Sequence, residues 1–330
     1  CSGNERGFLI TGSELIMATR PHVLVLSGGI SHERDISLKS GRKVADGLSA
    51  HGLTVTLRDP DAGLIDYLRQ EKPDVVWPVL HGASGEDGAL RGLLDMLGIA
   101  YVGPNADATR LAWNKPVAKT LVERSGVMTP ESITLSRDAF RELGAESVLA
   151  TVGDSLGMPL IVKPAQGGSA QGVSWVESTD DLRKAMVHAF TYCDIALIEK
   201  RIIGPEVCVT IIDSGDGPIA IQPVEIEPLS GHYDFEARYT AGATRFFTPP
   251  RLGSDSLARL TSDALLAFNA LGLRHLARID FIVDADGLPW FLEASTMPGL
   301  TETSSTALAL DTAGYDLGGV YAALVHSAAS

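Results

Sequence analysis

Cysteine is scarce in this sequence, which has three in 330 residues: Cys1, Cys193 and Cys208. Their spacing fits no metal-binding motif and three are too few for a disulfide framework, so we expect a reduced, cytoplasmic setting. A basic surplus is also lacking, since 41 acidic residues against 27 lysines and arginines leave a net charge of -14. We therefore expect no nucleic-acid partner, and any anionic ligand must be held by local cations and backbone donors.

Long apolar runs are missing too. A helix that spans a bilayer needs about 20 mostly apolar residues, and no stretch approaches that length, so we expect no membrane partner. Residues 1–16 precede Met17 and lack the hydrophobic periodicity of the later segments. We interpret them as an upstream or disordered segment outside the fold, although a leading cysteine could instead mark a processed lipoprotein.

The hydrophobic content of 45% over this length is enough for two or three domains. Near the start, the run 23–27 predicts a buried strand, Gly28-Gly29 a tight turn, and the next segment a helix through Leu48. Further strands are expected at 53–57 and 75–79, with helices at 64–70 and 89–97. Together these predict a small doubly wound α/β domain over 17–112.

The turn at Gly28-Gly29 could be taken for a dinucleotide-binding turn. That interpretation fails because the third glycine of the fingerprint is missing and a polar SHERD run comes next. Glu33 stands where a helix begins at the carboxyl end of a strand, which is where open α/β sheets bind ligands. The plain alternative is an acid placed favourably in a first helical turn.

In the middle of the chain, a strand at 160–164 ends on Lys163 and leads into a glycine-rich loop at 165–172 and another strand. The backbone amides of such a loop can close over phosphates while Lys163 supplies a point charge. A plain hairpin with a solvated lysine is the alternative. A later strand, 195–200, ends on the pair Glu199-Lys200, and Glu206 comes after a turn.

Towards the C-terminus, the alternation of 278–283 predicts a strand, and Asp286-Gly287 predicts a two-residue hairpin turn. That turn would place Asp280 opposite Glu293, and Arg278 opposite Ser295, on one face of the sheet. Facing carboxylates repel unless a cation lies between them, and a hard divalent ion such as Mg²⁺ suits carboxylate and phosphate oxygens. The alternative is an ordinary solvated polar face.

Taken in order, these motifs resemble those of the ATP-grasp superfamily and, within it, the D-alanine–D-alanine ligases. The resemblance covers the chain from about residue 23 to residue 304 and is carried by SGGISHERDISLKSG, LHGASGEDGALRG, NKPVAK, VKPAQGGSAQG, EKRIIGPE, YDFEARY, RIDF and EASTMPGLTETS. It implies an α/β, three-domain ATP-grasp fold. The N-terminal substrate domain would cover 17–112, a central nucleotide-binding domain 113–200, and a C-terminal catalytic and metal-binding domain 201–330.

The resemblance also implies an activity. ATP phosphorylates the carboxylate of one D-alanine, the amine of a second attacks the acyl phosphate, and the dipeptide serves peptidoglycan synthesis. The implied ATP-binding residues are Lys115, Lys163, Gly168, Ser169, Glu199, Lys200, Glu206 and Arg238. The implied metal ligands, for Mg²⁺ or Mn²⁺, are Asp280, Glu293 and Ser295. A homodimer is usual in such ligases.

The substrate-binding and catalytic roles are implied by the same resemblance. Glu33 would hold the first ammonium group, completed by Ser169 and Tyr239 with His81 nearby. The oxyanion would be stabilised by Arg278 and the amide of Gly299. The second substrate would be bound by Ser304 and Ser305.

Three positions depart from the family pattern. Ser295 stands in place of a metal-binding asparagine, Arg238 in place of a lysine, and Ser305 in place of an apolar residue beside the second substrate. An arginine presents its donors differently from a lysine. These departures leave two alternatives open: a ligase of another amino-acid or hydroxy-acid pair in a secondary-metabolite pathway, and a catalytically weak ATP-binding homologue.

Overall fold

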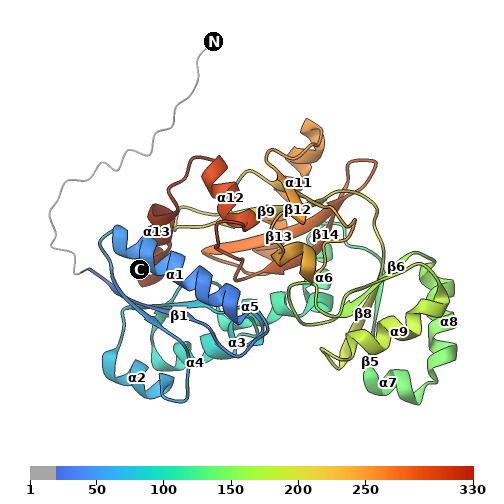
Figure 1. Cartoon of the computed structure of the whole chain (residues 1–330), viewed down its shortest axis with the longest axis horizontal. Coiled ribbons are helices and arrows are strands. Elements are labelled where there is room, and N and C mark those ends of the chain that lie inside the picture. Colours follow the sequence, from blue (N-terminus) through green and yellow to red (C-terminus); the bar gives the residue numbers. More distant parts are fainter. Residues whose placement is uncertain (1–19) are drawn as a thin grey trace, which may run out of the picture.

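The computed structural model describes residues 20–330, so the interpretation of residues 1–16 lies outside the described part. Three sheets form the framework, and one falls in each of the predicted segments 17–112, 113–200 and 201–330 (Figure 1). The expected α/β class is confirmed. None of the described helices has the length and apolar character needed to cross a membrane.

The first sheet has the order β2-β1-β3-β4, and its strand pairs are parallel. Its strands are β1 (His22–Ser27), β2 (Thr54–Arg58), β3 (Val75–Val79) and β4 (Ala100–Tyr101). Val23 and Val25 face one hydrophobic core while Leu24 and Leu26 face another, which is why β1 is apolar at four successive positions. Helices cover both faces: α1 (Arg34–Ala50), α2 (Leu64–Glu71), α3 (Ala83–Glu86) and α4 (Ala89–Leu97).

The second sheet is antiparallel with the order β5-β8-β6-β7. Its strands are β5 (Ser132–Ser136), β6 (Leu160–Pro164), β7 (Ser174–Val176) and β8 (Ile195–Lys200), and its helices are α7 (Arg137–Glu142), α8 (Ala145–Leu156) and α9 (Thr179–Ala189). Leu160 and Val162 pack against these helices, whereas Ile161 and Lys163 alternate onto the other face and line a cavity. That uncovered face is where the site forms.

The third sheet has the order β12-β11-β9-β13-β14, with β10 paired to β9. Its strands are β9 (Glu206–Ile212), β10 (Ile219–Ala220), β11 (Val224–Pro228), β12 (Thr244–Phe247), β13 (Leu276–Val283) and β14 (Pro289–Ser295). One face packs against α6 (Lys115–Arg124) and the amphipathic helix α11 (Ser254–Ala270). The short helix α5 (Ala106–Trp113) contacts β14, and the short helix α10 (Phe235–Tyr239) lies between β11 and β12 in the chain.

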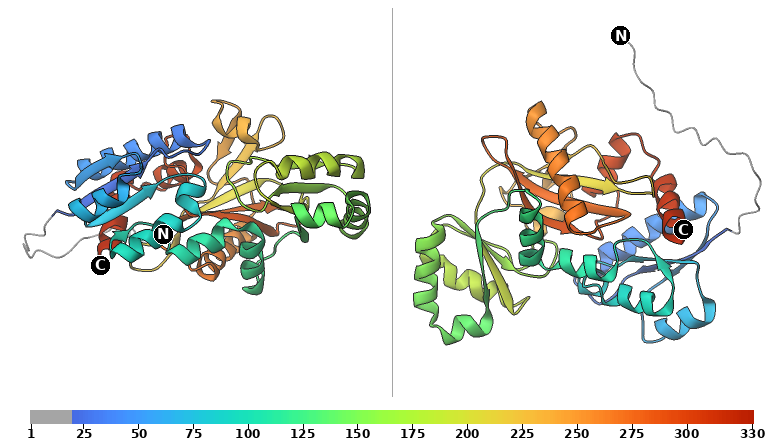
Figure 2. Two further views of the ribbon diagram at one scale, coloured as in Figure 1. Left: turned by 90° about the horizontal axis from the view of Figure 1, so that it is seen from below. Right: turned by 180° about the vertical axis from the view of Figure 1, so that it is seen from behind.

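The last helix, α13 (Leu317–Ala329), returns to the first sheet, where it contacts α1, β3 and β4 (Figure 2). The helix before it, α12 (Ser305–Thr312), contacts β9 and β11 of the third sheet. Leu324 and Val325 of α13 share one core with Val23 of β1, with Leu48 of α1 and with Ile226 of the third sheet. The first and third sheets are therefore joined through a common hydrophobic core.

The hairpin of β13 and β14 confirms the predicted pairs but corrects the predicted turn. Asp280 pairs with Glu293, and Arg278 with Ser295, as expected. However, the amide of Asp284 donates a hydrogen bond to the carbonyl of Leu288, so these two residues close the hairpin. The loop therefore holds three residues, 285–287, instead of two. The register shifts next to Asp280, leaving Leu292 as the extra residue of a β-bulge.

The bulge decides which way Glu293 points. Phe291 and Ala294 belong to the core, while Leu292 and Glu293 both line a cavity. Without the bulge, strict alternation from Phe291 would send Glu293 into the core. The longer loop and the bulge offset each other, which is why the predicted pairing holds although the predicted turn does not.

Candidate functional site

Two adjoining cavities lie where the three sheets meet, one of about 630 Å³ and one of about 120 Å³. We call them the larger and the smaller cavity. Both are lined by Lys115, Gly167, Gly168, Arg238 and Glu293. The predicted site residues in the larger cavity are Glu33, His81, Lys115, Gly168, Ser169, Arg238, Tyr239, Arg278, Glu293, Ser295, Gly299, Ser304 and Ser305, and the smaller adds Lys163, Glu199, Glu206 and Asp280.

Lys200 lines neither cavity. Its ammonium group is directed to Glu131, 3.1 Å away and exposed. The position of this side chain does not test a contact between the backbone of Lys200 and the nucleotide.

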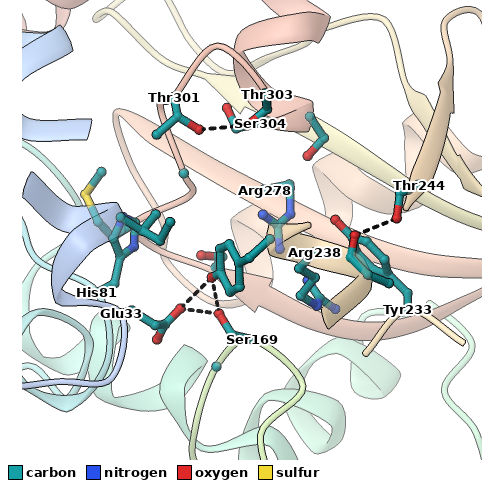
Figure 3. A pocket seen from close by; sticks show the side chains of 18 of the residues that line it. Glu33, His81, Ser169, Tyr233, Arg238, Thr244, Arg278, Thr301, Thr303 and Ser304 are labelled. Carbon is teal, nitrogen blue, oxygen red and sulfur yellow. Dashed lines mark hydrogen bonds between the residues drawn. The ribbon is translucent and has the colours of Figure 1, made fainter. Parts of the chain in front are cut away.

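Three segments far apart in sequence meet at Glu33 (Figure 3). The Ser169 hydroxyl donates to the Glu33 carboxylate, and the Tyr239 hydroxyl donates to the same oxygen at 3.1 Å. The Ser169 and Tyr239 oxygens also lie within hydrogen-bond distance of each other, but each hydroxyl has one proton, so neither donates to the other while both donate to Glu33. Ser169 has a φ of 51°, so the turned backbone of the glycine-rich loop brings its side chain here. Burial, together with the charge of Glu33, raises the pKa of Tyr239 to about 12, which keeps its hydroxyl a donor.

Behind Glu33 lie two buried groups from the loop between β3 and α4. Burial lowers the pKa of His81, whose Nε2 atom has no hydrogen-bond partner among the described residues. Burial, together with Glu33, raises the pKa of Glu86 to about 8, and Glu86 accepts a hydrogen bond from the amide of Gly82 at 2.8 Å. These pKa shifts favour the neutral imidazole of His81 and the neutral acid of Glu86 beside Glu33.

Arg278 occupies the middle of the larger cavity (Figure 3). Its Nε and one terminal nitrogen each donate to a separate oxygen of Asp280 at 2.7 Å. Although burial opposes the charge, Asp280 raises the pKa of Arg278. Such a two-point contact fixes the plane of the guanidinium group and leaves its remaining donors for a ligand.

Glu293 is held by Lys115, the first residue of α6. The Lys115 ammonium lies 2.9 Å from the Glu293 carboxylate and donates to the carbonyl of Gly167 at 2.6 Å. Burial opposes ionisation, but Lys115 and Arg238 lower the pKa of Glu293 to about 2. Glu293 is therefore anionic at neutral pH, directly opposite Asp280.

The oxygen-bearing side chains of β13 and β14 fit a metal ion only if another ligand completes its coordination shell. Within residues 20–330, no three or more His, Cys, Asp or Glu side chains form a group that could hold a metal. What the strands offer is the carboxylates of Asp280 and Glu293 with the hydroxyl of Ser295 two residues on. Mg²⁺ commonly takes one or two carboxylates and completes its shell with phosphate oxygens and water, so these donors suit it together with a phosphate ligand.

Arg238 lines both cavities. Its guanidinium carbon lies 4.0 Å from the ring centre of Tyr233, and a terminal nitrogen lies 3.8 Å from Glu206. Its Nε atom is buried and has no partner within the described residues. Burial raises the pKa of Glu206 to about 7, with Arg238 acting in the opposite direction. A buried donor without a partner beside two cavities is available to an anion.

The far end of the larger cavity is rich in hydroxyl groups. Ser304 caps α12 by accepting a hydrogen bond from the amide of Ala307 at 3.2 Å. Ser305 is buried beside the thiol of Cys208. Thr301 and Thr303 continue the same wall, and Gly299 lies close by. This end can bind a polar group at the start of a helix.

Several residues in and around the site were not predicted, among them Trp175, Glu86 and Lys119. Trp175 lines the smaller cavity and stacks on His232 with ring centres 4.4 Å apart. Glu86 and Lys119 lie inside quoted motifs without an assigned role. The signal for Lys119 was its spacing of four from Lys115, which puts both lysines on one helix face.

Comparisons with known proteins agree with this arrangement. A family model described as D-ala D-ala ligase C-terminus matches residues 121–326, and one described as D-ala D-ala ligase N-terminus matches residues 63–104. The D-alanine–D-alanine ligase of Gloeobacter violaceus is 39% identical over 295 residues, which cover 89% of this chain and 95% of that protein.

Solved structures are similar as well. A D-alanine–D-alanine ligase from Bacillus anthracis is 27% identical, with a TM-score of 0.80, covering 93% of this chain and 97% of that one. The structure of that ligase complexed with ATP has a TM-score of 0.75 at 26% identity, covering 94% and 96% of the two chains.

Proposed function

The chain belongs to the D-alanine–D-alanine ligase family, and from that premise we propose that it joins two D-alanines into D-alanyl-D-alanine at the expense of ATP, for peptidoglycan synthesis. The observation that carries this function is the junction of Glu33, Ser169 and Tyr239 beside Arg278. An anion that can hold an ammonium group there adjoins a cavity lined by cations that can hold phosphates.

The nucleotide would lie between the second and third sheets. Lys163, Lys115 and Arg238 present positive charge to the smaller cavity, and the loop at 165–172 offers backbone donors. Glu206 and the strand end at Glu199-Lys200 would meet the ribose and the adenine. The three-domain division at 17–112, 113–200 and 201–330 is part of the same proposal, supported by one sheet in each segment.

The reaction needs a first carboxylate aimed at the γ-phosphorus atom. Glu33 would bind the ammonium group of the first D-alanine, and that binding would point the carboxylate towards Arg278. Attack on phosphorus forms the acyl phosphate and releases ADP. The amine of the second D-alanine, with its own carboxylate at Ser304, then attacks the acyl carbon and phosphate leaves. Arg278 and the amide of Gly299 would donate to the oxyanion that forms.

The proposed metal is Mg²⁺ or Mn²⁺, held by Asp280, Glu293 and Ser295. When bound with the nucleotide, it would neutralise charge on the phosphates during transfer. Asp280 contacts Arg278, and Glu293 contacts Lys115. These cations would have to share the carboxylates with the metal.

The test is phosphate release from ATP measured across a panel of D- and L-amino acids. The proposal is supported if D-alanine is the only amino acid of the panel that causes phosphate release and if D-alanyl-D-alanine is formed. The panel includes D-serine and D-lactate, because Ser305 adds a hydroxyl group to the acceptor end and favours the alternative of another amino-acid or hydroxy-acid pair. ATP binding without release for any substrate would point to a catalytically weak homologue.

Oligomeric state and location are the remaining parts of the proposal. We propose a cytoplasmic homodimer, on the strength of the family resemblance and the scarcity of cysteine. Sedimentation of the purified chain at several concentrations tests the dimer. A single species at monomer mass over that range would remove it.

A further inference from the structure

Helix α6 directs two lysines to two different carboxylates. The helix begins at Lys115 because the side chain of Asn114 caps it and Pro116 occupies its first turn. Lys119 comes one turn later on the same face. Lys115 contacts Glu293 in the third sheet, whereas Lys119 contacts Glu199 in the second. One helix face thus reaches both walls of the smaller cavity.

Lys119 itself does not line either cavity, since it is buried behind Glu199 and 3% exposed. Its ammonium group donates to one Glu199 oxygen at 2.6 Å and to the carbonyl of Pro130 at 2.8 Å. The other Glu199 oxygen lies 2.5 Å from the ammonium group of Lys163, which lines the smaller cavity. The order from the protein interior to the cavity is Lys119, Glu199, Lys163.

The charges of this row depend on one another. Burial opposes ionisation of Glu199, but Lys163 and Lys119 outweigh it and lower the pKa of that carboxyl group. Burial lowers the pKa of Lys119, and Glu199 opposes that change. Two cations and one anion leave the row with a net positive charge next to the cavity. Without Lys119, Lys163 would be the only cation paired with the carboxylate of Glu199, and the two charges would cancel.

We propose that Lys119 is a positioning residue that acts through Glu199. Lys119 donates to one of the two carboxylate oxygens of Glu199 and balances its charge, so that Lys163 extends towards the cavity with its own charge available to the phosphates of a ligand. The inference rests on the proposed function in that the ligand is a nucleotide. It differs from the roles already assigned, because Lys119 touches neither nucleotide nor substrate.

The experiment compares ADP with adenosine as ligands, by calorimetry on the full chain. Lys119→Gln removes the charge but keeps an amide donor for Pro130. We expect ADP affinity to fall about 10-fold, as for the loss of a charge-assisted contact, while adenosine affinity stays within twofold. Lys184→Gln on the exposed face of α9 makes the same change in net charge far from the site and should alter neither.

A second measurement asks whether the effect passes through Glu199. In a Glu199→Gln background there is no anion for Lys119 to satisfy, so adding Lys119→Gln should change ADP affinity less than twofold. Equal losses of ADP and adenosine affinity would mean that Lys119 merely supports the fold. A full 10-fold loss in the Glu199→Gln background would mean that Lys119 acts without Glu199. Either result overturns the proposal.

Lys119→Arg covers the case in which the glutamine variant does not fold. It keeps the charge, so ADP affinity within threefold of wild type supports the proposal, and a 10-fold loss confined to ADP overturns it. A failure of the proposed ligase reaction can be told apart from a failure of the proposed role of Lys119, because these measurements need nucleotide binding and no amino acid. A wild-type chain that binds ADP but forms no dipeptide would remove the proposed reaction and leave the role of Lys119 standing.

Discussion

Single charged residues in this site are held by other charged residues before any ligand arrives. Arg278 is paired with Asp280, Lys115 with Glu293, and Lys163 with Glu199. Each pair joins a cation suited to phosphate with an anion, so every ion has a partner in a partly buried place. A nucleotide would have to exchange some of these contacts for its own, which makes the geometry of each cation important.

At Arg278, we expect the planar geometry of the guanidinium group to affect turnover in addition to its charge. In Arg278→Lys the charge remains, but the planar group that contacts both oxygens of Asp280 is lost. We expect ATP to bind normally while turnover falls at least about 100-fold, the usual cost of a lost oxyanion donor. Arg259→Lys on the exposed side of α11 is the matched control. Turnover within threefold of wild type in Arg278→Lys would exclude the oxyanion role.

Serine 295 is the residue where the proposed metal site departs from the family pattern. Ser295→Asn should keep or improve activity because the amide oxygen reaches further, while Ser295→Ala should raise the Mg²⁺ concentration needed for half-maximal turnover. Titrating Mg²⁺ against turnover and against nucleotide binding separates the two variants. An unchanged Mg²⁺ dependence in Ser295→Ala would show that the two carboxylates suffice.

At the scale of elements, the β13–β14 hairpin places the proposed metal ligands by a bulge and not by its turn. β13 is paired on both sides, to β9 and to β14, and Phe281 and Phe291 are buried. The loop 285–287 begins with two exposed residues. Register is therefore specified by the burial of one face and by the pairing of β13 on both edges, with Leu292 as the point where it shifts.

Two insertions distinguish the bulge from the turn. One alanine added after Ala285 should be absorbed by the exposed loop, with turnover within about threefold of wild type. One alanine added after Leu292 should move Glu293 towards the core face and remove turnover, since a one-residue slip reverses a strand's faces. Turnover and nucleotide binding are measured together. Loss of turnover in the loop insertion would mean that the turn does set the register.

At the scale of the whole molecule, the first and third sheets are tied together at Gly103. Its amide donates to the Nδ1 atom of His275 at 2.9 Å, and its carbonyl accepts from the Nε of Arg274 at 2.7 Å. His275 has a φ of 66° and is buried. Burial, together with Arg274, lowers the pKa of His275 to about 4. The junction needs His275 neutral, because a protonated Nδ1 cannot accept.

Stability should therefore depend on pH through His275. The pKa is about 6.5 in the unfolded chain and about 4 in the folded chain, so the contribution is complete above pH 6.5 and is lost as the pH falls towards 4. The loss between pH 8 and pH 5 is about 2 kcal/mol.

The matched variant is His275→Asn. The side-chain oxygen of asparagine can accept the hydrogen bond from the Gly103 amide, asparagine tolerates a positive φ, and its side chain does not titrate. Thermal melts of wild type and variant from pH 8 to pH 5 check this. The wild-type melting temperature should fall more steeply, and parallel curves would contradict the prediction.

The sequence by itself determined the class, the order of the motifs and most elements. Alternation in β6 and the continuous apolar runs of β1 and β3 depend only on which faces are buried, and these strands lie where predicted. The spacing of the glycine-rich loops and charged residues identified the family. All but one of the predicted site residues line the two cavities, because the ordered motifs carry that information.

Only the tertiary structure decided how distant residues meet. No local pattern reveals the bulge at Leu292, because alternation cannot show where one residue is extra. The partner of Lys119 lies 80 positions away, and helical spacing gives the face of Lys119 but not what faces it. Trp175 fits a core strand by composition, yet the face it occupies opens on a cavity. Each outcome depends on packing between segments, which the neighbours of a residue in sequence do not specify.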